Sequence, residues 1–277
     1  MTLEDKYKKL EGLLREMGEI VIAYSGGVDS TFLLRVAVDV LGDKALGILA
    51  TSATYPTREF KEAVSLAEKM RAQLRIIETK ETDNIKFSEN PPDRCYFCKS
   101  ELFTKVQEIA QEEGIKFVAD GSNLDDVGDF RPGMRALKEQ QVRSPLREAQ
   151  FTKNDIREMS RRLGLPTWNK PSLACLSSRF PYGSSIDLKK LTMVDRAENF
   201  LQDNGFSVVR VRHYEDTARI ELSDQEIARF LEPEIRNHVV KEFKDIGYKY
   251  VTLDLQGYRT GSMNEVLSVA EKLEHTR

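Results

Sequence analysis

A glycine pair between a buried strand and a helix most constrains what this chain can fold into. The stretch "YSGGVDS", residues 24–30, ends the apolar run "GEIVIA" and opens the helical pattern "DSTFLLRVAVDVLGD". Two glycines let backbone amides approach an anion, and the helix N-terminus adds free N–H groups and a partial positive charge. A turn with no ligand is the alternative, but the preceding strand, the flanking serines and the internal aspartate favour a phosphate- or pyrophosphate-binding loop. The lysine pattern of an ordinary P-loop NTPase is absent.

Strands and helices alternate along the first 125 residues or so. Further buried strands are predicted at "ALGILA" (45–50), "QLRIIET" (73–79) and "IKFVADGSN" (115–123), with helices at 57–70 and 100–114 between them. This rhythm predicts an α/β fold with a doubly wound, mostly parallel sheet.

The pattern changes after about residue 180. "VVRVRHY", "ARIEL" and "YVTLDL" alternate apolar and polar residues, as half-buried strands do, and helices are expected near 187–204 and 233–246. We therefore predict two domains, residues 1–180 and 181–277. The boundary is expected within "PTWNKPSLACLSSRFPYGSS".

Composition excludes several classes of protein. A net charge of −3 argues against a broad nucleic-acid surface. No apolar run approaches the roughly 18 residues of a membrane helix. Residues 1–18 form a charged amphipathic pattern without a signal-peptide core. Three cysteines in 277 residues do not suit a secreted disulfide scaffold, so we expect a cytoplasmic protein.

A second polar loop follows the fourth predicted strand. In "ADGSNLDD", residues 119–126, Gly121 would let the backbone approach a ligand, and Asp125 and Asp126 are candidate metal or orienting carboxylates. Ligands of open parallel sheets bind at the carboxyl ends of the strands, where this loop is expected. A turn with solvated acids is the competing interpretation.

The motif Ser-Gly-Gly-x-Asp-Ser resembles the loop of the ATP pyrophosphatase, or PP-loop, superfamily. That resemblance implies an adenine nucleotide alpha hydrolase-like fold and cleavage of ATP between its α- and β-phosphates. It implies that Asp29, with Asp126, helps to bind Mg²⁺, which prefers oxygen ligands, and that Gly121 lies against the AMP moiety. The implied pyrophosphate-binding residues are Ser25, Gly26, Gly27, Asp29, Ser30 and Thr31.

Three longer stretches extend the resemblance over nearly the whole chain. They are "FRPGMRALKEQQVRSPL" (130–146), "TKNDIREMSRRLGLPTWNKPSLACLSSRFPYG" (152–183) and "LDLQGYRTGSMNE" (253–265). With YSGGVDS they resemble the LarE family of ATP-dependent sulfur transferases of nickel-pincer nucleotide biosynthesis. The family implies that MgATP adenylates a carboxylate of pyridinium-3,5-biscarboxylic acid mononucleotide. Sulfur then displaces AMP to give a thiocarboxylate.

The family resemblance implies that Cys175, in "PSLACLSSR", is the catalytic sulfur residue. Some members sacrifice the sulfur of that cysteine and keep dehydroalanine. This chain adds Cys95 and Cys98 in "RCYFCKS". The three cysteines resemble those of PP-loop tRNA thiolases, in which three thiolates hold a 4Fe-4S cluster and leave one iron open to an exogenous sulfide.

Three other interpretations of the cysteines stay open. Zinc can bind three thiolates and one outside ligand, for which His213 is a candidate. Cys95 and Cys98 can form a redox pair while Cys175 is an unrelated core thiol. Thiols without a function are the third.

Basic side chains are the expected substrate ligands. Arg210 and Arg212 lie two apart on a predicted strand, so they share one face. Arginine binds phosphate in a bidentate manner, and the pair resembles the phosphate-binding arginines of the family, with Arg179 nearby. Ion pairs on a solvated sheet face are the alternative, with Glu215 and Glu221 as partners.

Two other classes of function compete with sulfur transfer. Another PP-loop enzyme, such as a tRNA thiolase or an amidotransferase-type synthetase, would share the loop. A non-catalytic metal or redox sensor would use the thiols but not the loop. We expect an enzyme that uses a small-molecule nucleotide and a sulfide or other sulfur donor, forms a homo-oligomer and binds neither membrane nor nucleic acid.

Overall fold

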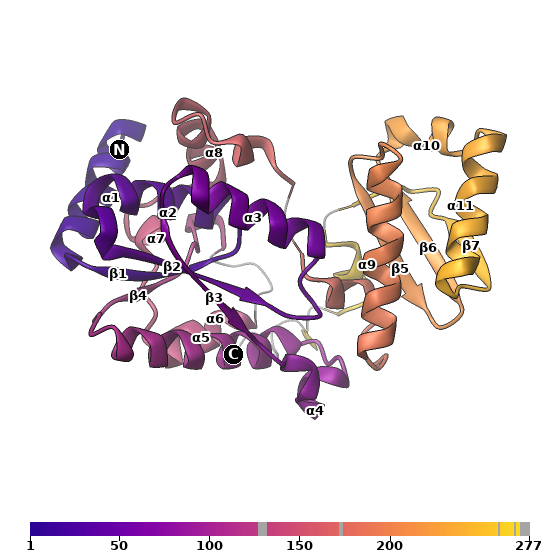
Figure 1. The fold of residues 1–277 in the computed structure, drawn as a ribbon, viewed down its shortest axis with the longest axis horizontal. Helices are drawn as coiled ribbons and strands as arrows, with labels where there is room; N and C mark the ends of the chain where they lie inside the picture. Colours follow the sequence, from indigo (N-terminus) through magenta and orange to yellow (C-terminus); the bar gives the residue numbers. More distant parts are fainter. Residues whose placement is uncertain (127–131, 172–173, 260, 269, 272–277) are drawn as a thin grey trace.

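Two β-sheets lie in separate parts of the molecule, and the helix α9 (Leu188–Asp203) is on the side of the second sheet that faces the first (Figure 1). The computed structural model describes residues 1–126, 132–171, 174–259, 261–268 and 270–271. Phe130, Arg131, Ser172, Leu173 and Thr260, which belong to the quoted sequence stretches, lie outside the described residues.

The first sheet is parallel and has the strand order β3-β2-β1-β4. Its strands are β1 (Ile20–Tyr24), β2 (Ala45–Thr51), β3 (Gln73–Glu78) and β4 (Val118–Ala119). β1 lies in the interior, with Ile22 opposite Gly47 on one side and Ala119 on the other. The carboxyl ends of all four strands therefore meet at one edge of the sheet.

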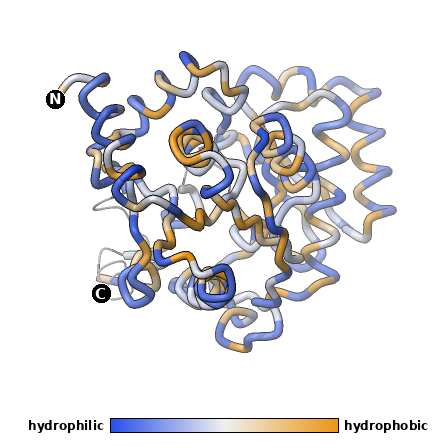
Figure 2. The backbone as a smooth tube through the Cα atoms, turned by 60° about the vertical axis from the view of Figure 1, so that its left-hand side comes forward, coloured by the Kyte–Doolittle hydropathy of each residue, from blue (hydrophilic) through white to orange (hydrophobic). Residues whose placement is uncertain are grey.

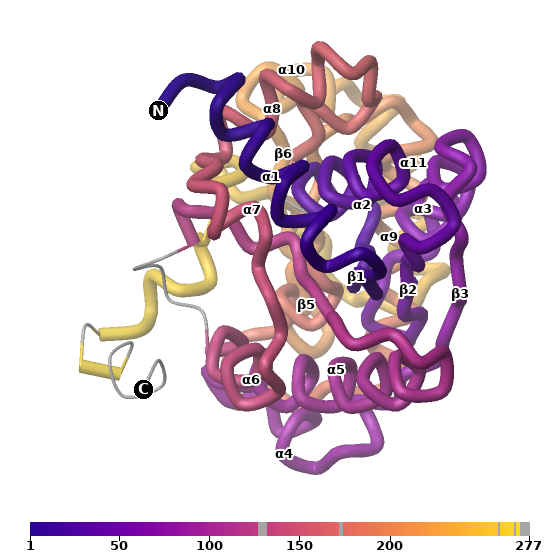
Figure 3. Tube along the Cα trace, turned by 90° about the vertical axis from the view of Figure 1, so that its left-hand side faces the viewer, coloured from indigo at the N-terminus to yellow at the C-terminus, as the bar shows by residue number. Residues whose placement is uncertain are grey.

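Helices cover both faces of this sheet (Figure 3). One layer contains α1 (Leu3–Met17), α2 (Val28–Leu41), α3 (Thr57–Lys69) and α8 (Lys153–Arg162), and the other contains α5 (Arg94–Glu112) and α6 (Gly133–Glu139). β1 shows why both layers form. Ile20, Ile22 and Tyr24 pack with the first layer, whereas Val21 packs with α5. The predicted doubly wound α/β fold is confirmed.

The fourth strand is much shorter than predicted. Only Val118 and Ala119 pair with β1. On their other side the Arg143 backbone takes the place of a strand, because its N–H donates to the Val118 carbonyl at 2.8 Å and its carbonyl accepts from the Asp120 N–H at 3.0 Å. The polar residues after Ala119 leave the ladder and form the loop at the carboxyl edge.

The second sheet has the order β5-β6-β7. β5 (Val209–Tyr214) and β6 (Thr217–Leu222) are antiparallel, and β7 (Tyr250–Leu253) is parallel to β6. α9 and α11 (Pro233–Ile246) confirm the two predicted helices, and α10 (Asp224–Phe230) was not predicted. The core of this part joins the sheet to α9 and α11 through residues such as Val211, Ile220 and Phe243.

Two short helices, α4 (Ile85–Ser88) and α7 (Pro145–Glu148), complete the set of α-helices among the described residues. Hydrophobic stretches gather toward the middle of the molecule, and hydrophilic stretches dominate the outer turns (Figure 2). Within the described part of the chain, no helix is long and apolar enough to cross a membrane. The predicted domain boundary near residue 180 remains a prediction.

Candidate functional site

The glycine loop lies at the carboxyl edge of the parallel sheet, as predicted. β1 ends at Tyr24 and α2 begins at Val28. Gly26 has φ +64°, and a Cβ there would lie 2.6 Å from the Cβ of Ala63, so the loop requires glycine at this position. Gly27 is the N-cap of α2 and supplies no side-chain cap, which leaves the first amides of the helix for another acceptor.

A cavity of about 220 Å³ opens beside this loop. Ser25, Gly27, Asp29 and Ser30 line it from the loop side, and Gly121 and Asp126 line it from the loop after β4. Six of the residues singled out in the sequence therefore line one cavity, and their roles in ligand binding remain predictions. Gly26 and Thr31 are not among its described lining residues. Thr31 is fully buried and its amide donates to the Gly27 carbonyl at 3.0 Å within the helix.

Gly121 has a packing role that the sequence did not reveal. A Cβ at this position would lie 2.9 Å from the backbone nitrogen of Ser30. Glycine therefore lets the loop after β4 approach the first turn of α2. The close approach narrows the cavity where the two loops meet.

Asp29 and Asp126, two carboxylates that line the cavity, have hydrogen-bond partners in neighbouring segments. Asp29 accepts from Lys153 Nζ at 2.5 Å and from Asn123 Nδ2 at 3.4 Å. The Lys153 amide donates to Asp125 Oδ2 at 2.7 Å, and Asp126 is buried and accepts from the Asn123 amide at 2.9 Å. Asp29 and Asp126 thus present two carboxylates at one cavity, which suits a hard divalent cation.

The sequence analysis missed two lysines, one that lines the cavity and one that pairs with Asp29. Lys153 begins α8 and reaches Asp29 from a position 124 residues away in the chain. Lys99 lines the cavity from α5, and its side chain lies so close to Gly133 that a Cβ there would be 2.5 Å from the Lys99 Cδ. Lys99 follows the second cysteine directly, which is the one signal that could have suggested its position near the site.

The two cysteines of RCYFCKS lie inside a helix rather than before it. α5 begins at Arg94, so Cys95 and Cys98 are three apart on its first turns and face the same direction. We expected the helix to begin after the cysteines, and that boundary was wrong. None of the three cysteines is in a disulfide.

Cys175 joins this pair from a distant segment. Cys98 packs on the cluster that contains Leu176, the residue after Cys175. Cys95 and Cys175 interact electrostatically with Cys98, and together with burial and the nearby Glu81 carboxylate they raise the pKa of the Cys98 thiol, burial being the largest cause. The three thiols therefore lie within electrostatic reach of one another, and their role as ligands of one cluster remains a prediction.

Two buried ionisable side chains flank the thiols. Glu81 accepts from the hydroxyls of Ser52 (2.6 Å) and Thr54 (2.5 Å) through one carboxylate oxygen, while its other oxygen has no hydrogen-bond partner among the described residues. The Thr54 carbonyl accepts from the Leu176 amide at 2.8 Å, which ties the Cys175 segment to the loop after β2. Arg94 is the second of these side chains, with a charge that acts on Cys95 and Cys175.

No single-ion metal site is formed by these groups. Among the described residues, no three or more His, Cys, Asp or Glu side chains are arranged to hold one metal ion. His213 lies on the core face of β5, where its Nδ1 is 3.2 Å from the Tyr248 hydroxyl and its ring contacts Phe180. The surroundings of His213 therefore give no support to its role as an outside zinc ligand.

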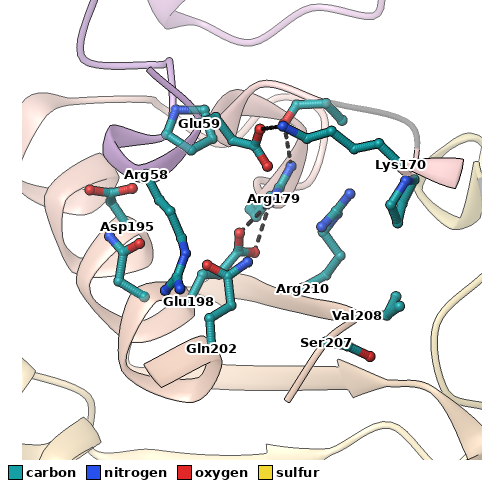
Figure 4. A pocket seen from close by; sticks show the side chains of 14 residues that line it. Arg58, Glu59, Lys170, Arg179, Asp195, Glu198, Gln202, Ser207, Val208 and Arg210 are labelled. Carbon is teal, nitrogen blue, oxygen red and sulfur yellow. Dashed lines mark hydrogen bonds and ion pairs between the residues drawn. The ribbon is translucent and has the colours of Figure 1, made fainter. Parts of the chain in front are cut away.

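A second cavity, of about 80 Å³, lies between α3 and the α9–β5 unit (Figure 4). Arg179 and Arg210 line it, as do Lys170 and Arg58. Figure 4 shows Arg179 held by Glu198, and the two guanidinium nitrogens lie 2.9 and 2.8 Å from the carboxylate oxygens. The lining thus carries four cations and three carboxylates, the latter from Glu59, Asp195 and Glu198.

Arg179 and Arg210 differ in how their surroundings affect the pKa of the guanidinium. Burial alone would lower the pKa of Arg179, but the Glu198 carboxylate raises it above its usual value. Glu198 is itself fully buried, and although burial favours its neutral form, Arg179 holds the pKa of that carboxyl below its usual value. For Arg210, burial and then the Arg179 charge lower the pKa, whereas the Glu198 carboxylate raises it.

The Arg212 side chain belongs to a buried ion-pair network. It shares a sheet face with Arg210, as predicted, since the register places Glu221 opposite Arg210 and Arg219 opposite Arg212. Arg212 donates to both oxygens of the fully buried Glu221, at 2.9 and 2.6 Å, and to the Ser178 carbonyl at 2.8 Å. Of the two interpretations of the pair, the cross-strand ion pair is formed by Arg212, which is not among the described residues that line the cavity.

The segment 174–179 connects the thiols to the arginine cavity. Arg179 Nη1 donates to the carbonyls of Ala174 and Cys175, at 2.9 and 3.0 Å. Cys175 is the N-cap of the short 3-10 helix Leu176–Arg179. The Cys175 thiol and the Arg179 guanidinium thus belong to the same turn.

Comparisons with known proteins match this geometry. The family model described as NAD synthase matches residues 3–109, which contain the glycine loop and the first cysteine pair. An uncharacterized protein of Synechocystis sp. is 44% identical over 96% of this chain and 99% of its own length.

Two further relatives also cover nearly the full length. The pyridinium-3,5-bisthiocarboxylic acid mononucleotide synthase of Lactiplantibacillus plantarum is 39% identical over 98% of both chains. An uncharacterized protein of Methanocaldococcus jannaschii is 30% identical over 94% of this chain and 100% of its own. Both parts of the fold, and both cavities, therefore lie within the aligned lengths.

Proposed function

Because the chain belongs to the family of the pyridinium-3,5-bisthiocarboxylic acid mononucleotide synthase, we propose that it is an ATP-dependent sulfur transferase acting on pyridinium-3,5-biscarboxylic acid mononucleotide. In this proposal each carboxylate is first activated by ATP and then converted to a thiocarboxylate. The product serves nickel-pincer nucleotide biosynthesis, as the LarE-like motifs predict.

The first step uses the glycine-loop cavity. A substrate carboxylate oxygen attacks the α-phosphorus of ATP, the bond between the α- and β-phosphates breaks, and pyrophosphate leaves. Ser25, Gly27 and Ser30 line the space where the pyrophosphate would bind, at the uncapped start of α2. Lys99 adds a positive charge on the opposite side of the cavity.

Magnesium fits the carboxylates of the same cavity. Asp29 and Asp126 would hold the ion, which supplies charge neutralisation for the phosphate oxygens when it is bound. Lys153 now balances the Asp29 charge at 2.5 Å. Lys153 would then be free to turn toward a phosphate when the cation takes over that carboxylate.

The arginine cavity is the proposed site for the substrate phosphate. Arg210 supports this assignment, because it lines the cavity together with Arg179 and carries a largely buried guanidinium there. Arg179 would contribute charge while Glu198 keeps its guanidinium in place. Arg212 would act mainly by holding the Ser178 backbone and, with it, the segment that carries Cys175.

The second step requires a sulfur near the acyl adenylate. A sulfur nucleophile adds to the carbonyl carbon, AMP leaves with the bonding electron pair, and a thiocarboxylate remains. The observation that carries the proposal is the placement of Cys175 and Arg179 on one turn, joined by the 3.0 Å hydrogen bond to the Cys175 carbonyl. This turn fixes the sulfur relative to the proposed phosphate site.

A 4Fe-4S cluster fits the three thiols better than one zinc ion. A cubane binds each thiolate on a different iron, so neighbouring cysteines need not converge on one ion. The buried Arg94 suits the negative charge of three thiolates. When bound, such a cluster would leave one iron open for an exogenous sulfide, whereas the sacrificial route would consume the sulfur of Cys175.

The test is to replace each cysteine by alanine and follow both steps with MgATP and the dicarboxylate substrate. We expect AMP and pyrophosphate from all three variants, and no thiocarboxylate with added sulfide from any of them. Iron and acid-labile sulfide counts on anaerobically purified protein should fall in all three equally.

Two results would contradict parts of this proposal. Formation of ADP would exclude the PP-loop reaction. A used protein lighter by one H₂S, with dehydroalanine at 175 and unchanged activity of the Cys95 and Cys98 variants, would replace the cluster by the sacrificial route. Intact-protein mass spectrometry distinguishes these outcomes.

A further inference from the structure

Arg94 is a buried cation with open hydrogen-bonding capacity. Only 5% of its surface is exposed, and its Nε and Nη1 atoms have no hydrogen-bond partner among the described residues. Buried guanidinium donors are normally satisfied, because each unmade hydrogen bond leaves the full desolvation cost in place. Two open donors on one buried arginine therefore need an explanation.

The surroundings of Arg94 supply no carboxylate for these donors. No described carboxylate forms an ion pair with it. Its guanidinium lies 5.0 Å from the centroid of the Tyr182 ring, which covers it on one side. Glu81, the buried acid of this region, is held by Ser52 and Thr54 and acts on Cys98.

The charge of Arg94 is directed at two of the three thiols. Cys95 and Cys175 are the groups whose negative charge acts on it most strongly. Cys95 is adjacent in sequence, and Cys175 approaches from the segment that Thr54 anchors through the Leu176 amide. The open donors and the thiols thus belong to one site built from α5 and the segment 174–179.

We propose that Arg94 forms a binding site for a small sulfur anion of the hydrosulfide class beside Cys95 and Cys175. This inference rests on the proposed sulfur transfer, because it assigns the place where an anionic sulfur donor is held before it is used. An anion can accept a hydrogen bond from Nε or from Nη1, whose N–H groups point to different sides of the guanidinium, and it neutralises the buried charge. Because the Tyr182 ring lies over the Arg94 guanidinium, a small anion fits this position better than a nucleotide.

The test compares an anionic with a neutral thiol reagent on the full-length, reduced protein with a chelator present. Iodoacetate and iodoacetamide react with the same thiolates, so the ratio of their rates isolates attraction of the anion. Peptide mass spectrometry reads Cys95, Cys98 and Cys175 separately, with glutathione as the reference. We expect an iodoacetate preference at Cys95 and Cys175 on the order of tenfold over glutathione, from charge-assisted hydrogen bonds.

Substitution of Arg94 should remove that preference. In Arg94→Gln the rate ratio should fall to the glutathione value, and in Arg94→Lys it should stay above it. Lys86→Gln is the matched control, since Lys86 is an exposed cation 5.8 Å from the Phe97 ring centroid in the same region, and it should leave the ratio unchanged.

If the Arg94 variants do not fold, the proposal can still be tested on the protein without any substitution. At constant ionic strength, thiocyanate should slow the iodoacetate reaction at Cys95 and Cys175 and leave the iodoacetamide reaction unaffected. Equal ratios in protein and glutathione, together with no competition by thiocyanate, would overturn the anion site. Adenylation of the substrate is measured separately, so a failure of the proposed function is recognised independently.

Discussion

The glycine-loop cavity and the arginine cavity both gather charge, but they hold it in opposite ways. In the first, Asp29 forms an ion pair with Lys153, and about a quarter of the Asp29 side chain and a third of the Lys153 side chain are exposed. In the second, Arg179 and Glu198 pair with only 2% and 7% exposed. The first pair can separate for a ligand, whereas the second is part of the packed structure.

This difference separates function from stability. Partly exposed pairs contribute little to folding, since water screens them and solvates each partner when they part. A buried pair is different, because removal of one partner leaves an uncompensated charge in the interior. Substitution of Asp29 should therefore affect chemistry alone, whereas substitution of Arg179 or Glu198 should affect both chemistry and folding.

The largest expected effect is on folding, from Glu198→Ala. The change leaves Arg179 buried without its partner and removes the acceptor of the Val211 amide, which lies 2.8 Å from Glu198 Oε1. We expect a loss of about 3–5 kcal/mol in the free energy of unfolding, measured by urea denaturation. Asp39→Ala, which breaks an exposed helix pair, is the control and should cost less than about 0.5 kcal/mol. Equal losses in the two variants would contradict the distinction between the cavities.

Asp29→Ala should give the opposite result. The carboxylate lies at a cavity rim, so the unfolding midpoint in urea should change little. A bound metal ion contributes several kcal/mol to stabilising charge in a transition state, so pyrophosphate release should fall by a hundredfold or more, on the order expected for ~3 kcal/mol. Release at the normal rate would remove Asp29 from the magnesium site.

Arg210→Ala and Arg212→Ala should have different effects on substrate binding and on stability. A charge-assisted hydrogen bond contributes roughly 1.5–3 kcal/mol, so Arg210→Ala should weaken binding of the nucleotide substrate about tenfold to a hundredfold at unchanged ATP affinity and stability. Arg212→Ala should also lower stability, because Glu221 is fully buried and would lose its main partner. Calorimetric binding and thermal unfolding test both claims. Normal substrate binding by the two variants would limit these arginines to a structural role.

The smallest expected effect is a pH dependence of stability from His213. Burial lowers the pKa of this histidine below its usual 6.5 in the folded protein. The unfolded chain then binds more protons in the window below pH 6.5, so stability is full above that pH and decreases as pH falls toward the lower, folded-state pKa. His213→Phe should flatten this part of the stability profile, and His238→Phe, at an exposed site, should not. An unchanged slope in the His213 variant would contradict the assignment.

Much of the fold was predictable because its causes are local. The apolar period of 3.6 along 28–41 and the apolar run 20–24 follow from neighbouring residues, and the structure confirms α2 and β1. The short fourth strand was not predictable, because the Arg143 backbone, 24 residues further along the chain, completes its pairing. α10 was missed because its seven residues are too few to show a period.

The sequence by itself determined the glycine loop, the neighbourhood of its six cavity residues and the family, because these depend on residue types at short, fixed spacing. The tertiary structure alone decided which charged side chains form ion pairs with each other. Lys153 pairs with Asp29, which is 124 residues away in the chain, and Arg212 pairs with Glu221 on the neighbouring strand. Burial and ion pairing depend on partners from other elements, so a strand pattern can place two arginines on one face but cannot tell which of them faces a cavity.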